Sequence, residues 1–330
     1  MLPPHARILV INVSRIGDTL LTTPALRALK SACPQGHLSC FAHPQRAALL
    51  EHLPFIDEIG HITAKRAWLN GWARTKKWDY AIVYGHDAPL LRYALRVAHS
   101  VTAFRQKDDA LNRKLAVAIE ESIGHAVHER MRLVEALGVA VSDFAVTYRT
   151  TESEQHFAHG WLAGHGAANA RPLIGFQVAS FPTKSYRDWP LESFVALGEQ
   201  LLATYPAAHI LILGGSESRG KARELAARLG RATAAAGGLS LRETAAVIAR
   251  LDLYIGVDTG PTHIAGALRV PMVALYHCRH RGRYLAPIGH PRFRLIEHPA
   301  SDADCLPSRP MSEITVDQVW RKARALLDGP

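Results

Sequence analysis

Residues 253–263 read LYIGVDTGPTH, an apolar run that passes directly into a polar loop. Five consecutive largely apolar residues predict a short strand buried on both faces, as in a parallel sheet. The pattern after Pro261 predicts a helix over 261–268, because proline is tolerated in the first turn of a helix. Strand, loop and helix in this order form the repeating unit of an α/β fold.

The same unit recurs on both sides of this stretch. The alternation predicts doubly wound parallel sheets with helices on both faces. Strands are expected at 8–13, 37–42, 80–84, 101–104, 173–177, 209–213, 253–257 and 272–276. Helices are expected at 22–32, 47–52, 88–99, 131–137, 152–162, 191–205, 221–229, 241–249, 261–268 and 316–327.

The chain has 330 residues, which favours two domains. Composition shifts over 150–171, so we place one Rossmann-like domain at 1–160 and a second at 161–330. We expect the final helix, 316–328, to pack back on the first domain. Two such domains facing each other form a cleft, and ligands bind beyond the carboxyl ends of the strands.

The formal net charge of +10 favours an anionic partner. No zinc-finger spacing or aromatic RNA-binding run is present, so nucleic acid is not expected. Four cysteines without a CxxC pair predict reduced, mostly buried thiols. The sequence has no signal-peptide pattern and no apolar stretch of about 20 residues, which predicts a cytoplasmic protein.

Residues 258–263 admit two interpretations. Asp258 or Thr259 could simply cap the following helix. Alternatively, Thr259 and Gly260 bring a hydroxyl and close backbone to a phosphate at the helix N-terminus, and His263 adds a hydrogen bond. The presence of both Gly260 and His263 directly after a predicted strand favours the phosphate site.

Two further loops that directly follow predicted strands carry polar groups. Asp18 follows the first strand, where it could serve as a general base or as an N-cap. Thr183, Lys184 and Arg187 follow the first strand of the second half, either as a cationic site for a leaving group or as a solvated loop.

Glycines precede Glu217 at residues 214–217, GGSE, where a carboxylate could bind ribose hydroxyls. No GxGxxG follows the first strand, which argues against a standard NAD site. Two basic clusters in the first half are either solvated faces or a surface for an anionic acceptor: Lys65, Arg66, Arg74, Lys76 and Lys77, and Arg105, Lys107, Arg113 and Lys114. Short-spaced histidine pairs predict surface or packing roles and no metal site.

Four motifs occur together along the chain: IGDTL at 16–20, TPAL at 23–26, KSYRDWP at 184–190 and VDTGPTHIA at 257–265. With them the chain resembles glycosyltransferase family 9, the ADP-heptose:lipopolysaccharide heptosyltransferases. The resemblance implies a GT-B fold, with the acceptor on the N-terminal domain and the nucleotide sugar on the C-terminal one.

The resemblance also implies roles for single residues. Asp18 matches the base of an inverting displacement. Glu217 matches a ribose contact, Leu239 falls where an apolar residue touches adenine, and Asp258 is assigned to the donor sugar or nucleoside. The donor diphosphate is assigned to Thr183, Lys184, Arg187, Thr259, Gly260 and His263.

Two departures from the family pattern stand out. Arg187 stands where the family commonly has lysine, so either Lys184 or Arg187 can serve as the phosphate cation. Residues 277–282, HCRHRG, replace a Gly-Pro-Thr-like stretch, which leaves the sugar and the acceptor open.

The expected function is inverting transfer of a heptose or similar sugar from an ADP-sugar to an anionic lipopolysaccharide-core acceptor. No acceptor residue is assigned, no cofactor is required, and Mg²⁺ or peripheral contact with the inner membrane would be compatible. Two alternatives remain: a GT-B transferase using another nucleotide sugar or a protein or small-glycan acceptor, and a non-catalytic nucleotide-sugar-binding protein.

Overall fold

A computed structural model describes residues 2–67 and 76–329. The chain divides into two compact units, Met1–Arg149 and Thr150–Pro330. This division precedes the boundary expected at residue 160, because α8 (Glu152–Gly164) packs within the second unit against α11 (Leu241–Ile248). Arg242 at the start of α11 donates to Glu154 of α8 at 2.8 Å. Arg74 of the first basic cluster lies outside the described residues.

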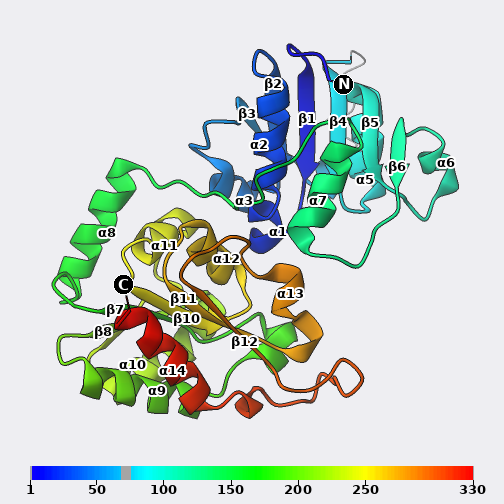
Figure 1. Ribbon diagram of the computed structural model, residues 1–330. Coiled ribbons are helices and arrows are strands. Elements are labelled where there is room, and N and C mark those ends of the chain that lie inside the picture. The colour runs from blue at the N-terminus through cyan, green and yellow to red at the C-terminus, as the bar shows by residue number, and fades with distance from the viewer. Residues whose placement is uncertain (1, 68–75, 330) are drawn as a thin grey trace. The chain divides into compact units, whose positions relative to one another are not determined.

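The first unit is built on a six-stranded parallel sheet with the strand order β3-β2-β1-β4-β5-β6 (Figure 1). This is the Rossmann order, in which β1 and β4 are neighbours at the topological switch point. Its strands are β1 (Arg7–Asn12), β2 (His37–Ala42), β3 (Glu58–His61), β4 (Trp78–Tyr84), β5 (Ala98–Phe104) and β6 (Val117–Ile119).

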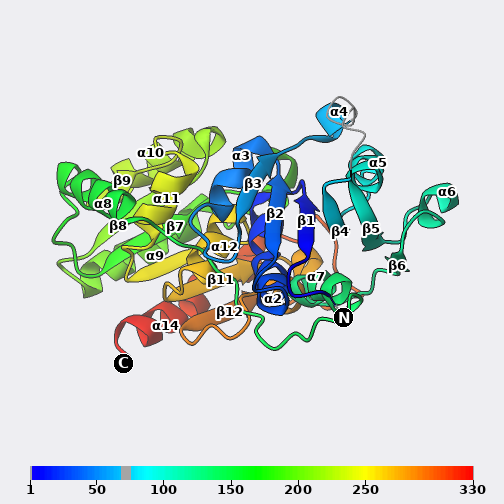
Figure 2. The same ribbon diagram turned by 90° about the horizontal axis from the view of Figure 1, so that it is seen from above.

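Helices cover both faces of this first sheet. Helices α2 and α7 lie together on one face, and α4 and α5 lie on the other (Figure 2). The expected helix at 47–52 is instead α3 followed by a 3-10 turn, Ala48–Leu50. The helices are α1 (Ile16–Leu20), α2 (Thr23–Ala32), α3 (Pro44–Ala47), α4 (Ala64–Ala67), α5 (Ala88–Val97), α6 (Asp109–Asn112) and α7 (Ala126–Glu135).

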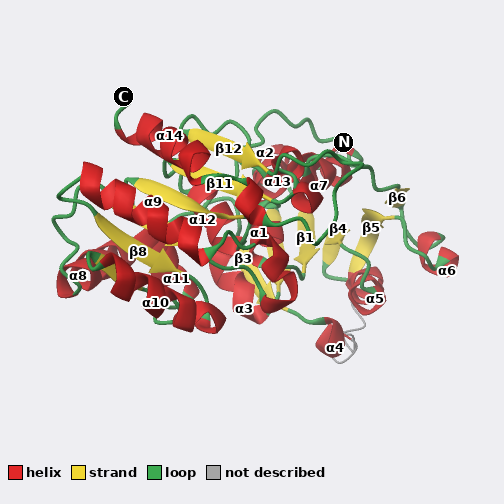
Figure 3. Ribbon diagram, turned by 90° about the horizontal axis from the view of Figure 1, so that it is seen from below, coloured by secondary structure: helices red, strands yellow, loops and turns green. Residues whose placement is uncertain are grey.

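The second unit repeats this topology with a parallel sheet in the order β12-β11-β10-β7-β8-β9. Its switch point therefore lies between β7 and β10. Its strands are β7 (Leu173–Gln177), β8 (His209–Leu213), β9 (Ala232–Ala234), β10 (Leu253–Val257), β11 (Met272–Tyr276) and β12 (Phe293–Glu297). Its remaining helices, shown with the strands in Figure 3, are α9 (Leu191–Thr204), α10 (Arg219–Leu229), α12 (Gly260–Ala267), α13 (Gly282–Leu285) and α14 (Val316–Leu327).

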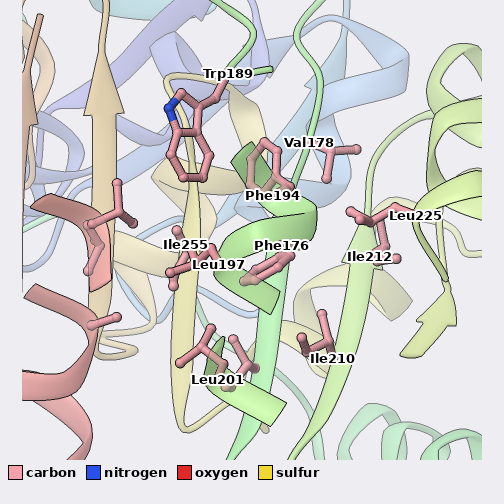
Figure 4. Close-up of a cluster of buried hydrophobic side chains, with 14 of the residues drawn as sticks. Phe176, Val178, Trp189, Phe194, Leu197, Leu201, Ile210, Ile212, Leu225 and Ile255 are labelled. Atoms are coloured by element: carbon pink, nitrogen blue, oxygen red, sulfur yellow. The ribbon is translucent and has the colours of Figure 1, made fainter. Parts of the chain in front are cut away.

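The core of the second unit lies between its sheet and helices α9, α10 and α14. Phe176 and Ile255 of the sheet pack against Phe194 and Leu197 of α9, all fully buried (Figure 4). Truncation of such a buried phenylalanine to alanine typically costs about 3–5 kcal/mol. This packing fixes the strand ends from which the polar loops leave.

The final helix, α14, packs on the sheet of the second unit. Val319, Ala323 and Leu326 of α14 are buried in the second unit's own core. Trp189 supports the same region, since its indole N–H donates to the carbonyl of Ile314 at 2.8 Å. The apolar face of α14 is therefore needed to complete the second unit.

Candidate active site

A short polar turn and helix α1 follow β1 at the switch point of the first sheet. Asp18 is the third residue of α1, and Arg15 occupies the N-cap position. The interpretation of Asp18 as an N-cap is therefore wrong. The buried Asn12 at the end of β1 donates to Thr22 Oγ1 at 2.8 Å, and Thr22 donates to the carbonyl of Asp18 at 2.9 Å. These bonds fix the backbone of α1 against the strand.

The carboxylate of Asp18 is held by an arginine that is distant in sequence. Arg130 of α7 donates from Nη2 to Asp18 Oδ1 at 2.7 Å and from Nε to Thr22 Oγ1 at 3.2 Å. The Arg130 side chain is 15% exposed and that of Asp18 is 39% exposed, so the carboxylate remains open to a ligand. An oriented, accessible carboxylate is suited to accept a proton from a hydroxyl.

A buried ion pair joins the loops that follow β7 and β10, the two neighbouring strands at the switch point of the second sheet. Arg187 ends the 3-10 segment Pro182–Arg187 after β7, and Asp258 follows β10. Arg187 Nη1 lies 2.7 Å from Asp258 Oδ2, and both side chains are at least nine-tenths buried. Arg187 Nε is buried and has no hydrogen-bond partner within the described part of the chain.

Asp258 also meets the helix that follows it. His263 Nε2 of α12 lies 3.5 Å from Asp258 Oδ1. Burial alone would raise the pKa of Asp258, but the hydrogen bond and charge of His263, together with Arg187 and His280, lower that pKa below its usual value. Asp258 is therefore an ionised carboxylate, and its negative charge is matched locally.

The N-terminus of α12 is not capped by a side chain. Thr259 occupies the N-cap position, as one interpretation expected, but its side chain makes no cap hydrogen bond. Thr262 instead donates to the carbonyl of Val257 at 2.6 Å and contacts the buried Tyr254 hydroxyl at 2.9 Å. Thr259 and Gly260 are partly exposed at this helix end, which carries a partial positive charge suited to an anion.

The segment Pro182–Arg187 adds cationic and hydroxyl groups. Thr183 is exposed and Lys184 is half-buried. Ser180 holds the turn, because its backbone N–H donates to Asp188 Oδ1 at 2.7 Å and its hydroxyl lies 2.7 Å from the carbonyl oxygen of Lys184. The two candidate cations thus have different surroundings, since Lys184 reaches the surface and Arg187 does not.

Glu217 and Leu239 lie on two loops that touch each other. Gly237 N donates to the carbonyl of Gly214 at 3.0 Å. At Gly214, φ is +155°, and an added Cβ would lie 2.0 Å from Ser218 Oγ, so only glycine suits this turn. Glu217 is exposed and Leu239 is half-buried, which gives this sheet edge one carboxylate and one apolar side chain.

The loop after β11 contains site neighbours that sequence reasoning missed. His280 Nε2 lies 2.8 Å from the hydroxyl of Tyr186, inside the Pro182–Arg187 segment. Burial, followed by the charges of Arg187 and Lys184, lowers the pKa of His280 from 6.5 to about 4. Tyr186 lies within the motif KSYRDWP, but its contact with His280, like that of Arg130 with Asp18, depends on tertiary packing.

The prediction of reduced cysteines is wrong for one pair. Cys278 and Cys305 form a disulfide with a Cα–Cα distance of 5.7 Å. Cys33 and Cys40 are free and buried, as expected. Cys278 and Cys305 are 27 residues apart, so no short spacing could have revealed their pairing.

The model of glycosyltransferase family 9 (heptosyltransferase) matches residues 88–304, which is more than half of the chain. The chain belongs to glycosyltransferase family 9. It is therefore a glycosyltransferase. Membership of this family supports heptose transfer in lipopolysaccharide synthesis as the general class of reaction. The matched region contains the whole segment from Thr183 to His263 but not Asp18.

Individual relatives are similar to this protein over most of its length. Lipopolysaccharide heptosyltransferase 2 of Salmonella typhimurium is 25% identical over 82% of both chains. A family 9 glycosyltransferase structure from Veillonella parvula aligns with a TM-score of 0.83 and 22% identity, covering 98% of this chain and 97% of that one. The structure of E. coli ADP-heptose lipopolysaccharide heptosyltransferase II gives 0.80 and 21%, covering 97% and 98%.

These similarities confirm the expected GT-B fold. They also agree with the duplicated Rossmann strand order of the two units. Across the described residues, no helix is both long and apolar enough to cross a membrane.

Proposed function

We propose that this family 9 enzyme transfers a heptose, or a similar sugar, from an ADP-sugar to an anionic lipopolysaccharide-core acceptor with inversion at the anomeric carbon. The observation that carries the proposal is the set of groups at the second switch point, where Arg187, Asp258 and His263 surround an uncapped helix N-terminus. The ADP-heptose donor is suggested by the similar E. coli protein, which is named for that donor.

In the proposed reaction, Asp18 accepts the proton of the acceptor hydroxyl. The hydroxyl oxygen forms a bond to the anomeric carbon while the bond from that carbon to the phosphate oxygen breaks, and ADP leaves. A single displacement of this kind inverts the anomeric configuration. Arg130 supports the role of Asp18, because its hydrogen bond to Oδ1 fixes the carboxylate.

The leaving diphosphate develops negative charge as the bond breaks. We propose that Lys184, Thr183, Thr259, Gly260 and His263 bind this diphosphate. Fixed cations and amide N–H groups stabilise such charge without reorganisation. Arg187 then has a mainly local role, since its Nη1 already neutralises Asp258, which we assign to the donor sugar or nucleoside.

The nucleoside is assigned to the neighbouring loops of the second unit. Glu217 would accept hydrogen bonds from ribose hydroxyls, and Leu239 would contact adenine. Their adjacency follows from the backbone bond between Gly237 and Gly214. The basic side chains of the first unit, including the exposed Arg66 and Arg105 near strand ends, suit an anionic acceptor.

No metal or other cofactor is required in this proposal, because protein groups supply the charge for the diphosphate. Stimulation by Mg²⁺ is compatible with it and is checked by assaying with and without a chelator. We place the reaction in the cytoplasm, with peripheral contact of the enzyme at the inner membrane.

The test is acceptor-dependent release of ADP from ADP-heptose, together with binding of ADP, UDP and GDP by calorimetry. We expect ADP to bind most tightly and to be released only when a lipopolysaccharide-core acceptor is present. Preference for UDP or GDP would replace the donor assignment with another nucleotide sugar. Tight ADP binding without turnover across a panel of acceptors would instead identify a binding protein.

A further inference from the structure

A disulfide links the turn after β11 to a long irregular segment. Cys278 begins the 3-10 turn Cys278–His280, and Cys305 lies in the connection over 298–310 between β12 and α14. Cys278 is 5% exposed, whereas Cys305 is half-buried. An attacking thiol would therefore reach Cys305 more readily.

The residues on either side of Cys278 contact the candidate diphosphate segment. His280 is hydrogen-bonded to Tyr186 at 2.8 Å, and the ring centroids of Tyr186 and His277 are 5.0 Å apart. Tyr186 stands directly before Arg187 and two residues after Lys184. A path of contacts thus runs from the turn that holds Cys278 to Tyr186, which lies in the same segment as Lys184.

The connection that holds Cys305 has other attachments to the same turn. His277 Nε2 lies 3.1 Å from the carbonyl of Arg309, and Arg281 Nε lies 2.5 Å from Asp302 Oδ1. Opening the disulfide would leave these contacts in place. The expected consequence is loosening of the turn rather than unfolding of the unit.

We propose that Cys278–Cys305 is a thiol–disulfide exchange site whose closure orders the segment Pro182–Arg187 through His280 and Tyr186. Its significance for catalysis rests on the proposed function, which assigns this segment to the donor diphosphate. Disulfides are uncommon in the cytoplasm, where we place the enzyme. The disulfide present in the structure would open to a dithiol where a thiol reductant is available and would close again under oxidising conditions.

A thiolate of an external dithiol attacks Cys305 Sγ, the Cys278–Cys305 bond breaks, and its electron pair leaves on Cys278 Sγ, which takes up a proton. The second thiol of the reductant then displaces Cys305, giving a protein dithiol and an oxidised reductant. Oxidation by a small disulfide runs the same steps in reverse and releases two thiols.

A metal site is the competing use of these groups. His277, Cys278 and Cys305 offer ligand atoms within 4.8 Å of one another. However, His277 Nδ1 already accepts the N–H of Arg279 at 3.1 Å, and Nε2 faces the carbonyl of Arg309. Structural zinc normally has four protein ligands, and the described residues provide three here.

The experiment compares the oxidised full-length chain with the chain reduced by dithiothreitol. Hydrogen exchange of the amides at 183–187 and the ADP dissociation constant are measured in both states. Reduction should speed exchange at 183–187 and raise the dissociation constant about fivefold, the effect of weakening one hydrogen bond. Cys305→Ser should behave as the reduced form in both conditions, and Cys33→Ala, which removes a thiol in the first unit, should respond as wild type.

The outcomes separate this inference from the proposed function. Faster exchange at 183–187 without ADP binding in either state would support the coupling and reject the ADP donor. Unchanged exchange at 183–187 after verified reduction would overturn the coupling. The reduced chain is also titrated with Zn²⁺. If it takes up one equivalent and Cys305→Ser does not, the groups form a metal site and the proposed thiol–disulfide exchange is rejected.

Discussion

Arg187 and Asp258 form a buried ion pair that joins the loops after β7 and β10, with Nη1 and Oδ2 2.7 Å apart. The two residues are 71 positions apart in the chain and meet because β7 and β10 are adjacent at the switch point. This pair fixes the start of α12 relative to Pro182–Arg187, and the proposed donor site is built on both.

Replacing either residue of this ion pair alone should destabilise the protein. Arg187→Gln or Asp258→Asn leaves an uncompensated buried charge, so each should lower the free energy of unfolding by about 3–5 kcal/mol. The double variant should lose less than the sum of the two single losses. Urea unfolding measures this, and Arg321→Gln, which breaks an exposed pair with Asp317, should change stability much less.

Lys184→Gln should separate ligand binding from folding. Lys184 is half-buried near the surface, so its loss should leave urea unfolding nearly unchanged. The ADP dissociation constant should rise at least about tenfold, because a hydrogen bond from a charged donor to phosphate is lost. Unaltered ADP affinity, measured by calorimetry, would remove Lys184 from the diphosphate site.

Arg130 should act through Asp18 as a positioning residue. Arg130→Gln removes the bond that orients the carboxylate, and we expect kcat to fall about ten- to a hundredfold with little change in ADP affinity. Arg130→Lys should restore part of the rate. Arg27→Gln is the matched control, since Arg27 forms an ion pair with Asp143 elsewhere in the first unit at 2.9 Å. Equal losses of kcat in both variants would indicate a general structural effect.

His280 should titrate well below an ordinary histidine. NMR should give a pKa of about 4 for its imidazole. Since the unfolded chain takes up this proton near pH 6.5, the stability tied to neutral His280 is present above pH 6.5 and is lost as pH falls toward 4. Lys184→Gln should raise the pKa of His280, because the charge of Lys184 contributes to the depression. A pKa near 6.5 in the native protein would contradict the packing of this turn.

The central strands were predictable from sequence, and the edge strands were not. Apolar runs such as Leu173–Gln177 and Met272–Tyr276 coincide with the observed β7 and β11. All four strands that were not predicted, β3, β6, β9 and β12, lie at sheet edges. Edge strands are only partly covered, so Glu58 and Arg294 can occupy them without disturbing a core, and the apolar signal disappears.

The candidate site was predictable only where it follows strand ends. Asp18, Lys184 and Asp258 are found by the strand-loop-helix pattern, because that pattern marks the carboxyl edge of a parallel sheet. Arg130 lies 112 positions from Asp18, and His280 lies 94 from Tyr186. Such partners depend on helix packing and on the course of an irregular loop, which local patterns do not specify.

The most direct test of the proposed reaction is turnover of ADP-heptose by Asp18→Asn in the presence of a lipopolysaccharide-core acceptor. The substitution keeps the side chain's shape but removes the proton acceptor. We predict a loss of kcat of about a hundredfold or more, with the ADP dissociation constant and the unfolding midpoint close to wild type. Asp143→Asn should leave turnover unchanged. Near wild-type turnover by folded Asp18→Asn would contradict the assignment of Asp18 as the base.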